Sequence, residues 1–468
     1  MDHKELLKAA DAYLDEHWED IVADITKLVE IPSYEELEKA APGAPYGPGP
    51  KAALEEALAL AERLGMEPHD VDGYIGYADL PGATDTQLGI IGHVDVVPAG
   101  PGWTIEPFQV QRRDGYLLGR GTLDDKGPMV TALHAVKLLA DLGVERPYTI
   151  RCLIGANEET DLMDVEYYRE RFADPAFVLT PDAEFPVCYG EKGGFNGTIT
   201  SAPVEDPQIV DFEGGVATNA VPGEAFAVVR ASGATLPGTD RITVTEQDDG
   251  LVRIDAKGKS AHASMPETGV NAIGLVVDYL LDQGIGNDYE RRFLEFLQKL
   301  LSCTDGSGVG LACSDADFGP LTVIGGTITI DDEHRIVQTM DVRFPTSIDG
   351  EGITAAMLRL TEPLGATFEN PLLLPPFLID PDSPIIQSLL GAYREVTGDD
   401  RKPFTIGGGT YAREFNAGSS FGVEMPWLPQ PEWVGAMHGP DEGIAEDVLK
   451  ASFRIYLLAL YELEQLDL

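Results

Sequence analysis

The chain has 468 residues, of which 43% are hydrophobic and 24% are charged, and this length exceeds that of one ordinary domain. Its 33 basic residues stand against 79 acidic ones, which gives a formal net charge of −46. A protein with this negative net charge repels nucleic-acid phosphates and anionic lipid headgroups, so neither nucleic acid nor a membrane surface is an expected partner. The four cysteines form no C-x-x-C pair, which excludes a zinc ribbon and a thioredoxin-like redox motif.

The N-terminal segment, MDHKELLKAADAYLDEHWEDIVADITKLVEI, has apolar residues at helical spacing and predicts an amphipathic helix. It has neither the basic start nor the apolar centre of a signal peptide. No apolar stretch in the chain approaches the roughly 20 residues that span a bilayer. The sequence therefore predicts a cytoplasmic protein.

Helices and strands alternate in the next part of the chain. KAALEEALALAERLG predicts a helix that ends at Gly65, and QLGIIGHVDVV predicts a strand buried on both faces. GPMVTALHAVKLLADLG predicts a helix that ends at Gly143, and YTIRCLIGANEE predicts another strand. This order is typical of an α/β fold with a central mixed, mostly parallel sheet.

The pattern changes from about residue 190 to about residue 380, where short alternating strands accompany helices near 270–283, 288–301 and 351–363. A helix at about 384–396, the loop GGGTYAR and a C-terminal helix at about 441–465 then resume the first pattern. We therefore expect an α/β domain formed by residues 1–188 and 384–468, interrupted by an α+β insertion at 189–383.

Polar side chains follow the ends of three predicted apolar strands. His93 and Asp95 lie in IIGHVD, Glu158 and Glu159 in CLIGANEE, and Asp182 in FVLTPD. Functional groups of α/β sheets gather at the carboxyl ends of parallel strands. These five side chains are therefore expected at one edge of the sheet.

Two further candidate ligands are Asp124, in the glycine-rich bend GRGTLDDKGP, and His438, in AMHGPDE. Imidazole and carboxylate together suit zinc or a similar divalent ion. The charges of Asp124, Glu159 and Asp182 balance those of two divalent ions and one bridging hydroxide, and such a pair of ions can activate water and polarise a carbonyl. Glu158 is then a candidate general base, and Asp95 a candidate partner for the imidazole of His93.

A series of motifs, in this order, resembles those of the zinc-dependent M20 metallopeptidases, dipeptidase (PepV-like) branch. They are GHVDVVPAGPGW, GRGTLDDKGP, GANEETD, TPDAEFPV, GGVATNAVPG, GKSAHASMPETGVNA, DVRFP, GGGTYAR and MHGPDE, and they cover nearly the whole chain. The resemblance implies two Zn²⁺ per chain, which Co²⁺ or Mn²⁺ can replace. His93 and Asp182 would bind one ion, Glu159 and His438 the other, and Asp124 would bridge them, with a cis peptide bond after it.

The resemblance also implies that the insertion is a lid domain over a catalytic domain. His262 would reach the oxyanion of the tetrahedral intermediate, with Asn219 beside it, and Glu158 would be the general base. The residues that would hold the substrate's carboxylate are Arg343, Gly408, Gly409 and Thr410. The insertion is long, and it resembles the lid of those family members in which additional lid structure takes the place of a partner subunit. We therefore expect a monomer.

The sequence thus predicts a dinuclear zinc hydrolase that cleaves the amide bond of a dipeptide, with a metal-bridging hydroxide as nucleophile. An N-acyl or succinyl amino-acid deacylase with the same metal centre is an alternative, as is a non-catalytic relative that binds a metal or a peptide. Two residues of the insertion also have structural alternatives. Arg343 would then pair with an acidic neighbour in its strand, and His262 would be an exposed loop residue.

Overall fold

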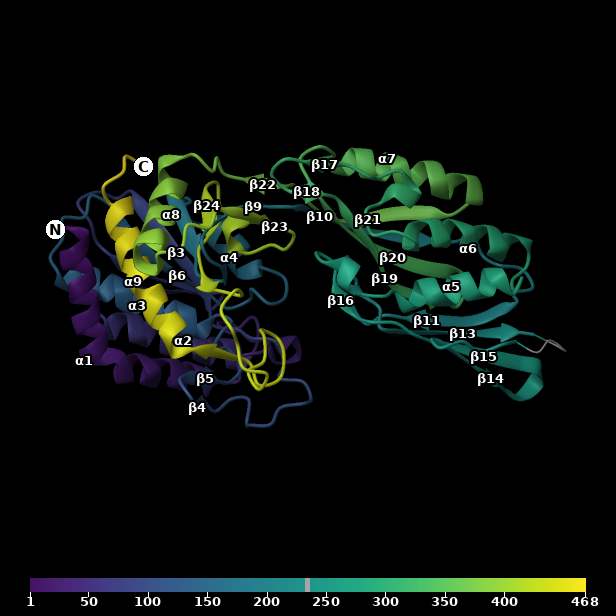
Figure 1. The fold of residues 1–468 in the computed structure, drawn as a ribbon, viewed down its shortest axis with the longest axis horizontal. Coiled ribbons are helices and arrows are strands. Elements are labelled where there is room, and N and C mark those ends of the chain that lie inside the picture. Colours follow the sequence, from purple (N-terminus) through teal and green to yellow (C-terminus); the bar gives the residue numbers. More distant parts are fainter. Residues whose placement is uncertain (232–235) are drawn as a thin grey trace. The chain divides into compact units, whose positions relative to one another are not determined.

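The computed structural model describes residues 1–231 and 236–468 and consists of two compact units (Figure 1). Unit 1 comprises Met1–Tyr189, Leu378–Phe404 and Gly409–Leu468, and unit 2 comprises Gly190–Phe377 and Thr405–Gly408. Residues 232–235, which belong to the expected insertion at 189–383, lie outside the described residues. Among the helices that are described, none combines the length and the apolar character that crossing a bilayer requires.

Unit 1 contains a mixed sheet with strand order β1-β2-β6-β3-β7-β24-β9. Its four central strands, β6, β3, β7 and β24, run parallel, and β1, β2 and β9 pair antiparallel. The α/β fold with a mixed central sheet is therefore confirmed. The bounds are β1 Glu67–Val71, β2 Ile75–Leu80, β3 Gln87–His93, β6 Thr149–Gly155, β7 Phe177–Thr180, β9 Cys188–Glu191 and β24 Gly418–Ser420.

Both faces of this sheet are covered, as the apolar strand sequences predict. Successive residues of β3 point to opposite faces: Ile90 belongs to the large core formed with the long helices, and Ile91 belongs to a smaller core with Val165 and Tyr411. The helices of the larger core are α1 His3–Val29, α2 Pro48–Arg63, α3 Lys126–Asp141, α8 Pro384–Thr397 and α9 Glu446–Leu463. The smaller core includes α4 Met163–Arg169 and the short helix η6 Tyr411–Glu414.

The predicted start of the C-terminal helix at about residue 441 is wrong. α9 begins at Glu446, because Gly443–Ala445 is extended and pairs as β26 with β5. The shorter elements of unit 1 are η1 Leu37–Lys39, β4 Gln111–Arg113, β5 Tyr116–Leu118, β8 Ala183–Glu184 and β25 Val423–Glu424. β22 Phe377–Leu378 and β23 Phe404–Ile406 lie where the chain passes from one unit to the other.

Unit 2 contains an antiparallel sheet of order β14-β15-β13-β11-β19-β20-β10-β21, and α5, α6 and α7 share its hydrophobic core. The helices predicted near 270–283, 288–301 and 351–363 are α5 Ala272–Asp282, α6 Asp288–Leu301 and α7 Gly350–Thr361. The main strands are β10 Gly193–Thr200, β11 Ile209–Gly214, β13 Glu224–Arg230, β14 Ile242–Glu246, β15 Leu251–Lys257, β19 Thr322–Ile330, β20 Ile336–Phe344 and β21 Thr367–Leu374. The smaller elements are β12 Ala220–Val221, β16 Ala261–His262, β17 Ser314–Asp315, β18 Gly319–Pro320, η2 Asp248–Gly250, η3 Pro266–Thr268, η4 Ser307–Val309 and η5 Glu362–Leu364.

One buried carboxylate at the end of α9 makes the stability of unit 1 depend on pH. Glu464 is 2% exposed; its Oε2 accepts from the Tyr148 N–H at 3.1 Å, and its Oε1 has no hydrogen-bond partner among the described residues. Burial raises the pKa of Glu464 to about 7. Because the folded-state pKa is raised, stability is greatest below the unfolded pKa and is lost as the pH rises through 7.

Glu464→Gln is therefore expected to raise the free energy of unfolding by roughly 1–3 kcal/mol at pH 8 and to change it little at pH 5. Urea unfolding at the two pH values measures this difference. Glu62→Gln, on the exposed side of α2, is the control for the loss of one negative charge. An equal effect of Glu464→Gln at both pH values would contradict the explanation.

Candidate metal centre

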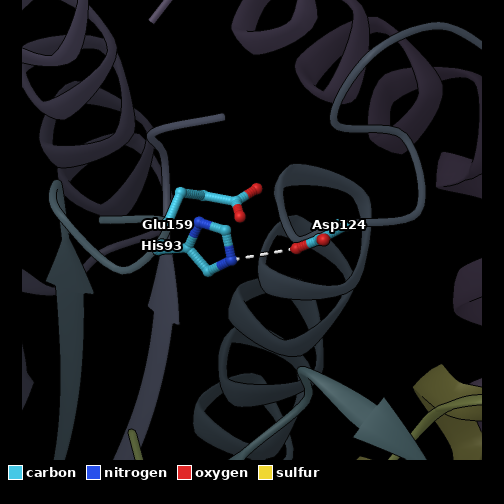
Figure 2. Close-up of side chains that lie close together, drawn as sticks. All are labelled: His93, Asp124 and Glu159. Atoms are coloured by element: carbon cyan, nitrogen blue, oxygen red, sulfur yellow. Dashed lines mark hydrogen bonds and ion pairs between the residues drawn. The ribbon is translucent and has the colours of Figure 1, made fainter. Parts of the chain in front are cut away.

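The carboxyl ends of β3, β6 and β7 bring together the predicted ligands of unit 1. His93 is the last residue of β3, Glu159 follows β6, and Asp182 follows β7. Asp124 lies in the bend immediately before α3. Figure 2 shows the imidazole of His93 directed at the carboxylate of Asp124, and the carboxylate of Glu159 lies above the imidazole in this view. The parallel order of the strands thus produces the cluster that their sequences predict.

Two histidine nitrogens face the two oxygens of one aspartate. His93 Nε2 lies 3.0 Å from Asp124 Oδ1 and 3.7 Å from Asp182 Oδ2. His438 Nε2 lies 2.9 Å from Asp124 Oδ2 and 2.9 Å from Glu159 Oε2. The cluster therefore divides into two groups, each with one imidazole and one carboxylate of its own, and Asp124 is shared between them.

Glu158 lies in the same cluster as the predicted ligands. Candidate ligand atoms of His93, Glu158 and Asp182 lie within 4.8 Å of one another, and so do those of His93, Asp124 and Glu159. His93 belongs to both groups, in which Glu158 lies with Asp182 and Glu159 lies with Asp124. Two adjacent glutamates in one cluster allow one of them to bind a cation while the other takes a proton.

The electrostatics of the cluster fit divalent cations. Burial, together with neighbouring carboxylates, raises the pKa of Glu158 well above its usual range and raises that of Asp182 to about 7. Burial likewise raises the pKa of Glu159, and the charge of Asp124 adds to the effect. Buried like charges are costly unless a cation compensates them. Carboxylate oxygens and imidazole nitrogens are ligands that Zn²⁺, Co²⁺ and Mn²⁺ accept.

Asp95 orients the imidazole of His93. His93 Nδ1 lies 3.0 Å from the main-chain oxygen of Asp95 and 3.4 Å from its Oδ1, so Nε2 is directed into the cluster. The contact predicted for the Asp95 side chain is thus shared with its carbonyl. Asp95 Oδ2 also accepts from the Glu159 N–H at 3.0 Å, which links the ends of β3 and β6.

The Asp124–Asp125 pair is explained by two different tasks. Their peptide bond is cis, as the family resemblance implies. Asp125 is fully buried, and its Oδ2 accepts from the His93 N–H at 3.2 Å. A Cβ at Gly127 would lie 2.1 Å from the Thr122 carbonyl oxygen, so this bend requires glycine there. Asp124 therefore faces the histidines, and Asp125 supports the strand that carries one of them.

Sequence reasoning missed a buried ion pair behind the cluster. Glu442 Oε1 accepts from the main-chain N–H groups of Gly121, Leu123 and Asp124 at 2.8, 3.2 and 3.3 Å. Its Oε2 pairs with Arg120, and Arg120 Nη2 also donates to the His438 carbonyl at 3.1 Å. Glu442 and Arg120 therefore connect the bend of Asp124 to the loop of His438. The motif MHGPDE contains Glu442, but nothing in its spacing indicates a contact with main-chain N–H groups.

A second buried carboxylate, also missed, supports the segment before Glu158. Asp164 Oδ2 accepts from the N–H groups of Ala156 and Asn157 at 2.8 and 3.0 Å, and from the Tyr411 hydroxyl. Tyr411 belongs to the motif GGGTYAR. Its neighbour Thr410 accepts from the Ala412 N–H at 3.1 Å and caps the short helix η6. This motif therefore contributes to the structure around the glutamates.

Two of the predicted residues in unit 2 lie side by side. Ala220 of β12 pairs with His262 of β16, and the Asn219 carbonyl accepts from the Ala263 N–H at 2.9 Å. His262 is exposed, and its Nδ1 accepts from the Ser264 N–H at 3.2 Å. His262 Nδ1 also lies 2.7 Å from the Ser264 hydroxyl, so both contacts with Ser264 hold the ring through Nδ1.

The structural alternative for Arg343 is present. Its Nε and Nη2 donate to the two carboxylate oxygens of Asp341 at 2.7 and 2.9 Å. The pair lies on β20, with the guanidinium half-buried. Gly408 is the last residue of unit 2, and Gly409 and Thr410 begin the return to unit 1.

The family of the chain follows from its match to known proteins. Residues 89–462 match the model of Peptidase family M20/M25/M40. The chain belongs to this family. Two M20 relatives, from Staphylococcus haemolyticus and Staphylococcus saprophyticus, are 33% and 34% identical to this chain over 463 and 467 residues, and each is named "Putative dipeptidase". In both cases the match covers 95% of this chain and 97% of the relative. The protein is thus an M20 metallopeptidase, a hydrolase.

Solved structures show the same M20 fold. Human carnosine dipeptidase 1 has a TM-score of 0.63 at 15% identity, and the match covers 98% of this chain and 99% of that one. The dipeptidase Dug1p from Saccharomyces cerevisiae has a TM-score of 0.63 at 12% identity, with 99% of each chain covered.

Proposed function

We propose that this M20 metallopeptidase is a dipeptidase that uses two divalent metal ions, in the first place Zn²⁺. The observation that carries the proposal is the position of Asp124, whose two oxygens face two different histidines, each accompanied by a further carboxylate. The names of the two staphylococcal relatives support a dipeptide as substrate.

In this proposal, His93 and Asp182 would hold one ion, Glu159 and His438 would hold the other, and Asp124 would contribute a ligand to both. The ions, when bound, would polarise the peptide carbonyl and lower the pKa of a water molecule, which makes it a better nucleophile once it has lost a proton. The Glu158 carboxylate takes the proton of the attacking water and delivers it to the leaving nitrogen. Asp95 keeps His93 Nε2 directed at the ligands.

Unit 2 and the segment that returns from it supply the residues proposed to bind the substrate. His262 is the proposed donor to the oxyanion that develops on the carbonyl oxygen, with Asn219 beside it. Asp341 holds the Arg343 guanidinium in a fixed orientation. Its Nη1, which has no hydrogen-bond partner among the described residues, is then the donor to the C-terminal carboxylate. Gly408, Gly409 and Thr410 supply main-chain N–H groups to the same carboxylate.

We expect the enzyme to act as a monomer in the cytoplasm. The basis for the monomer is the length of the lid, which supplies structure that a partner subunit provides in other forms of the fold. Sedimentation of the active enzyme measures this directly, and a stable dimer would contradict it.

Hydrolysis of a substrate panel by the purified enzyme tests the function. Free dipeptides, N-acetylated dipeptides, and N-acetyl and N-succinyl amino acids are compared with Zn²⁺, Co²⁺ or Mn²⁺ present. Only free dipeptides should be cleaved, a chelator should abolish the activity, and two ions per chain should be found by elemental analysis. Cleavage of the acylated amino acids alone would assign the chain to the deacylases. Metal binding without turnover would favour a binding protein.

A further inference from the structure

A pocket of about 260 Å³ lies in unit 1 between the segment that follows β25 and the start of α9. Most of its wall is apolar and is formed by Leu123, Met425, Pro426, Leu428, Pro429 and Ile444. Glu424, Gln430 and Asp447 also line it, and Asp447 is exposed in the first turn of α9. The pocket thus combines a hydrophobic wall with two carboxylates, and none of the proposed steps of catalysis uses it.

The Glu424 carboxylate has no counter-charge. Its main chain is fully used, because Glu424 pairs with Glu184 in the β25–β8 ribbon and its carbonyl accepts from the Phe185 N–H at 2.8 Å. Its side chain makes no hydrogen bond or ion pair with any described residue. Burial, together with the charges of Glu184 and nearby carboxylates, raises the pKa of Glu424 to about 7. A carboxylate in such surroundings gains from a cation that arrives with a ligand.

The pocket adjoins the metal ligands through two of its residues. Leu123 immediately precedes Asp124 in the bend. Glu424 lies beside Glu184, which is two residues beyond Asp182 on the segment that follows β7. The pocket wall and the metal ligands are therefore neighbours along two segments of the chain.

We infer that the pocket binds an alkylammonium group, with its methylene stem against the apolar wall and its charge at Glu424. One source is the side chain of a lysine at the N-terminus of a dipeptide, and this reading rests on the proposed function. It is the favoured source, because the pocket adjoins the ligands and other residues, Arg343 and 408–410, are assigned to the C-terminal carboxylate. A free aliphatic amine has the same chemistry and is the other source.

Kinetics with matched dipeptides test the favoured source. The metal-loaded enzyme is given Lys-Ala, norleucyl-Ala, which has a similar stem without the charge, and Ala-Lys. We expect kcat/KM for Lys-Ala to exceed that for norleucyl-Ala at least about tenfold. Glu424→Gln should reduce this ratio to about one, while norleucyl-Ala is cleaved almost as before. Glu432→Gln, exposed in the same loop and outside the pocket, should leave the ratio unchanged.

Binding of n-butylamine, detected by saturation-transfer NMR, gives a readout that does not depend on turnover. Binding that Glu424→Gln abolishes supports the pocket, and competition with Lys-Ala then assigns it to the substrate side chain. Binding without competition assigns it to a free amine. Equal kcat/KM values for the two N-terminal residues together with no Glu424-dependent binding of butylamine would overturn the inference, as would a preference for Ala-Lys alone. If no dipeptide is cleaved, the proposed function fails, and the butylamine experiment still decides the pocket.

Discussion

Replacing Glu158 by glutamine is expected to lower kcat for dipeptide hydrolysis by about 10²–10⁴-fold and to leave the metal content unchanged. Glutamine keeps the size of the side chain and removes its ability to take a proton, and a positioned base contributes a factor of this order. Glu158 lies within 4.8 Å of candidate ligand atoms on His93 and Asp182, so it can reach a water molecule in the cluster. Steady-state kinetics and elemental analysis of the same samples measure the two quantities.

Two further variants make the result specific. Glu159→Gln removes a proposed ligand, so it should lower the metal content along with activity, in contrast to its neighbour. Glu166→Gln, exposed on α4, should change neither quantity. If Glu158→Gln kept its metal and retained the kcat of the wild type, the base would have to be another group. If Glu158→Gln lost its metal, Glu158 would be a ligand.

The proposed ligands could be predicted from the sequence because their positions depend on local pattern. An apolar run that ends in a polar residue marks a strand end, and parallel strands bring their ends to one edge. His93, Glu159 and Asp182 follow this rule. Asp124 was found because a glycine-rich bend precedes a helical pattern, and the structure places that bend directly opposite β3.

Features that depend on main-chain direction could not be predicted in this way. Gly443–Ala445 was assigned to a helix because its sequence continues into the helical pattern, whereas pairing with β5 holds it extended. The contact between Asp341 and Arg343 is, by contrast, the structural alternative that the sequence offers for Arg343, because the two residues are two positions apart on one strand face. Glu442 accepts hydrogen bonds from main-chain N–H groups some 320 positions earlier in the chain. A pattern of side-chain types does not indicate the direction of main-chain N–H groups, so these contacts could not be predicted.

Glu442 is also the residue whose replacement should weaken metal binding most among those that do not touch the metal. Its buried carboxylate accepts from three N–H groups of the Asp124 bend and pairs with Arg120, which donates to the His438 carbonyl. Glu442→Gln places an amide N–H₂ against these donors. We expect the dissociation constant for Zn²⁺ to rise about 10–100-fold, the usual cost of losing a residue that orients ligands.

Competition with a chromogenic chelator measures this constant, and circular dichroism at the same temperature gives the fraction of folded protein. A merely structural role would lower the melting temperature and leave the affinity of the folded protein unchanged. Asp447→Asn, exposed in the first turn of α9, controls for the loss of charge. Because Glu442 and Arg120 act through one another, the double variant with Arg120→Gln should lose less affinity than the sum of the single losses. Strict additivity would show that the bend of Asp124 and the loop of His438 are held independently.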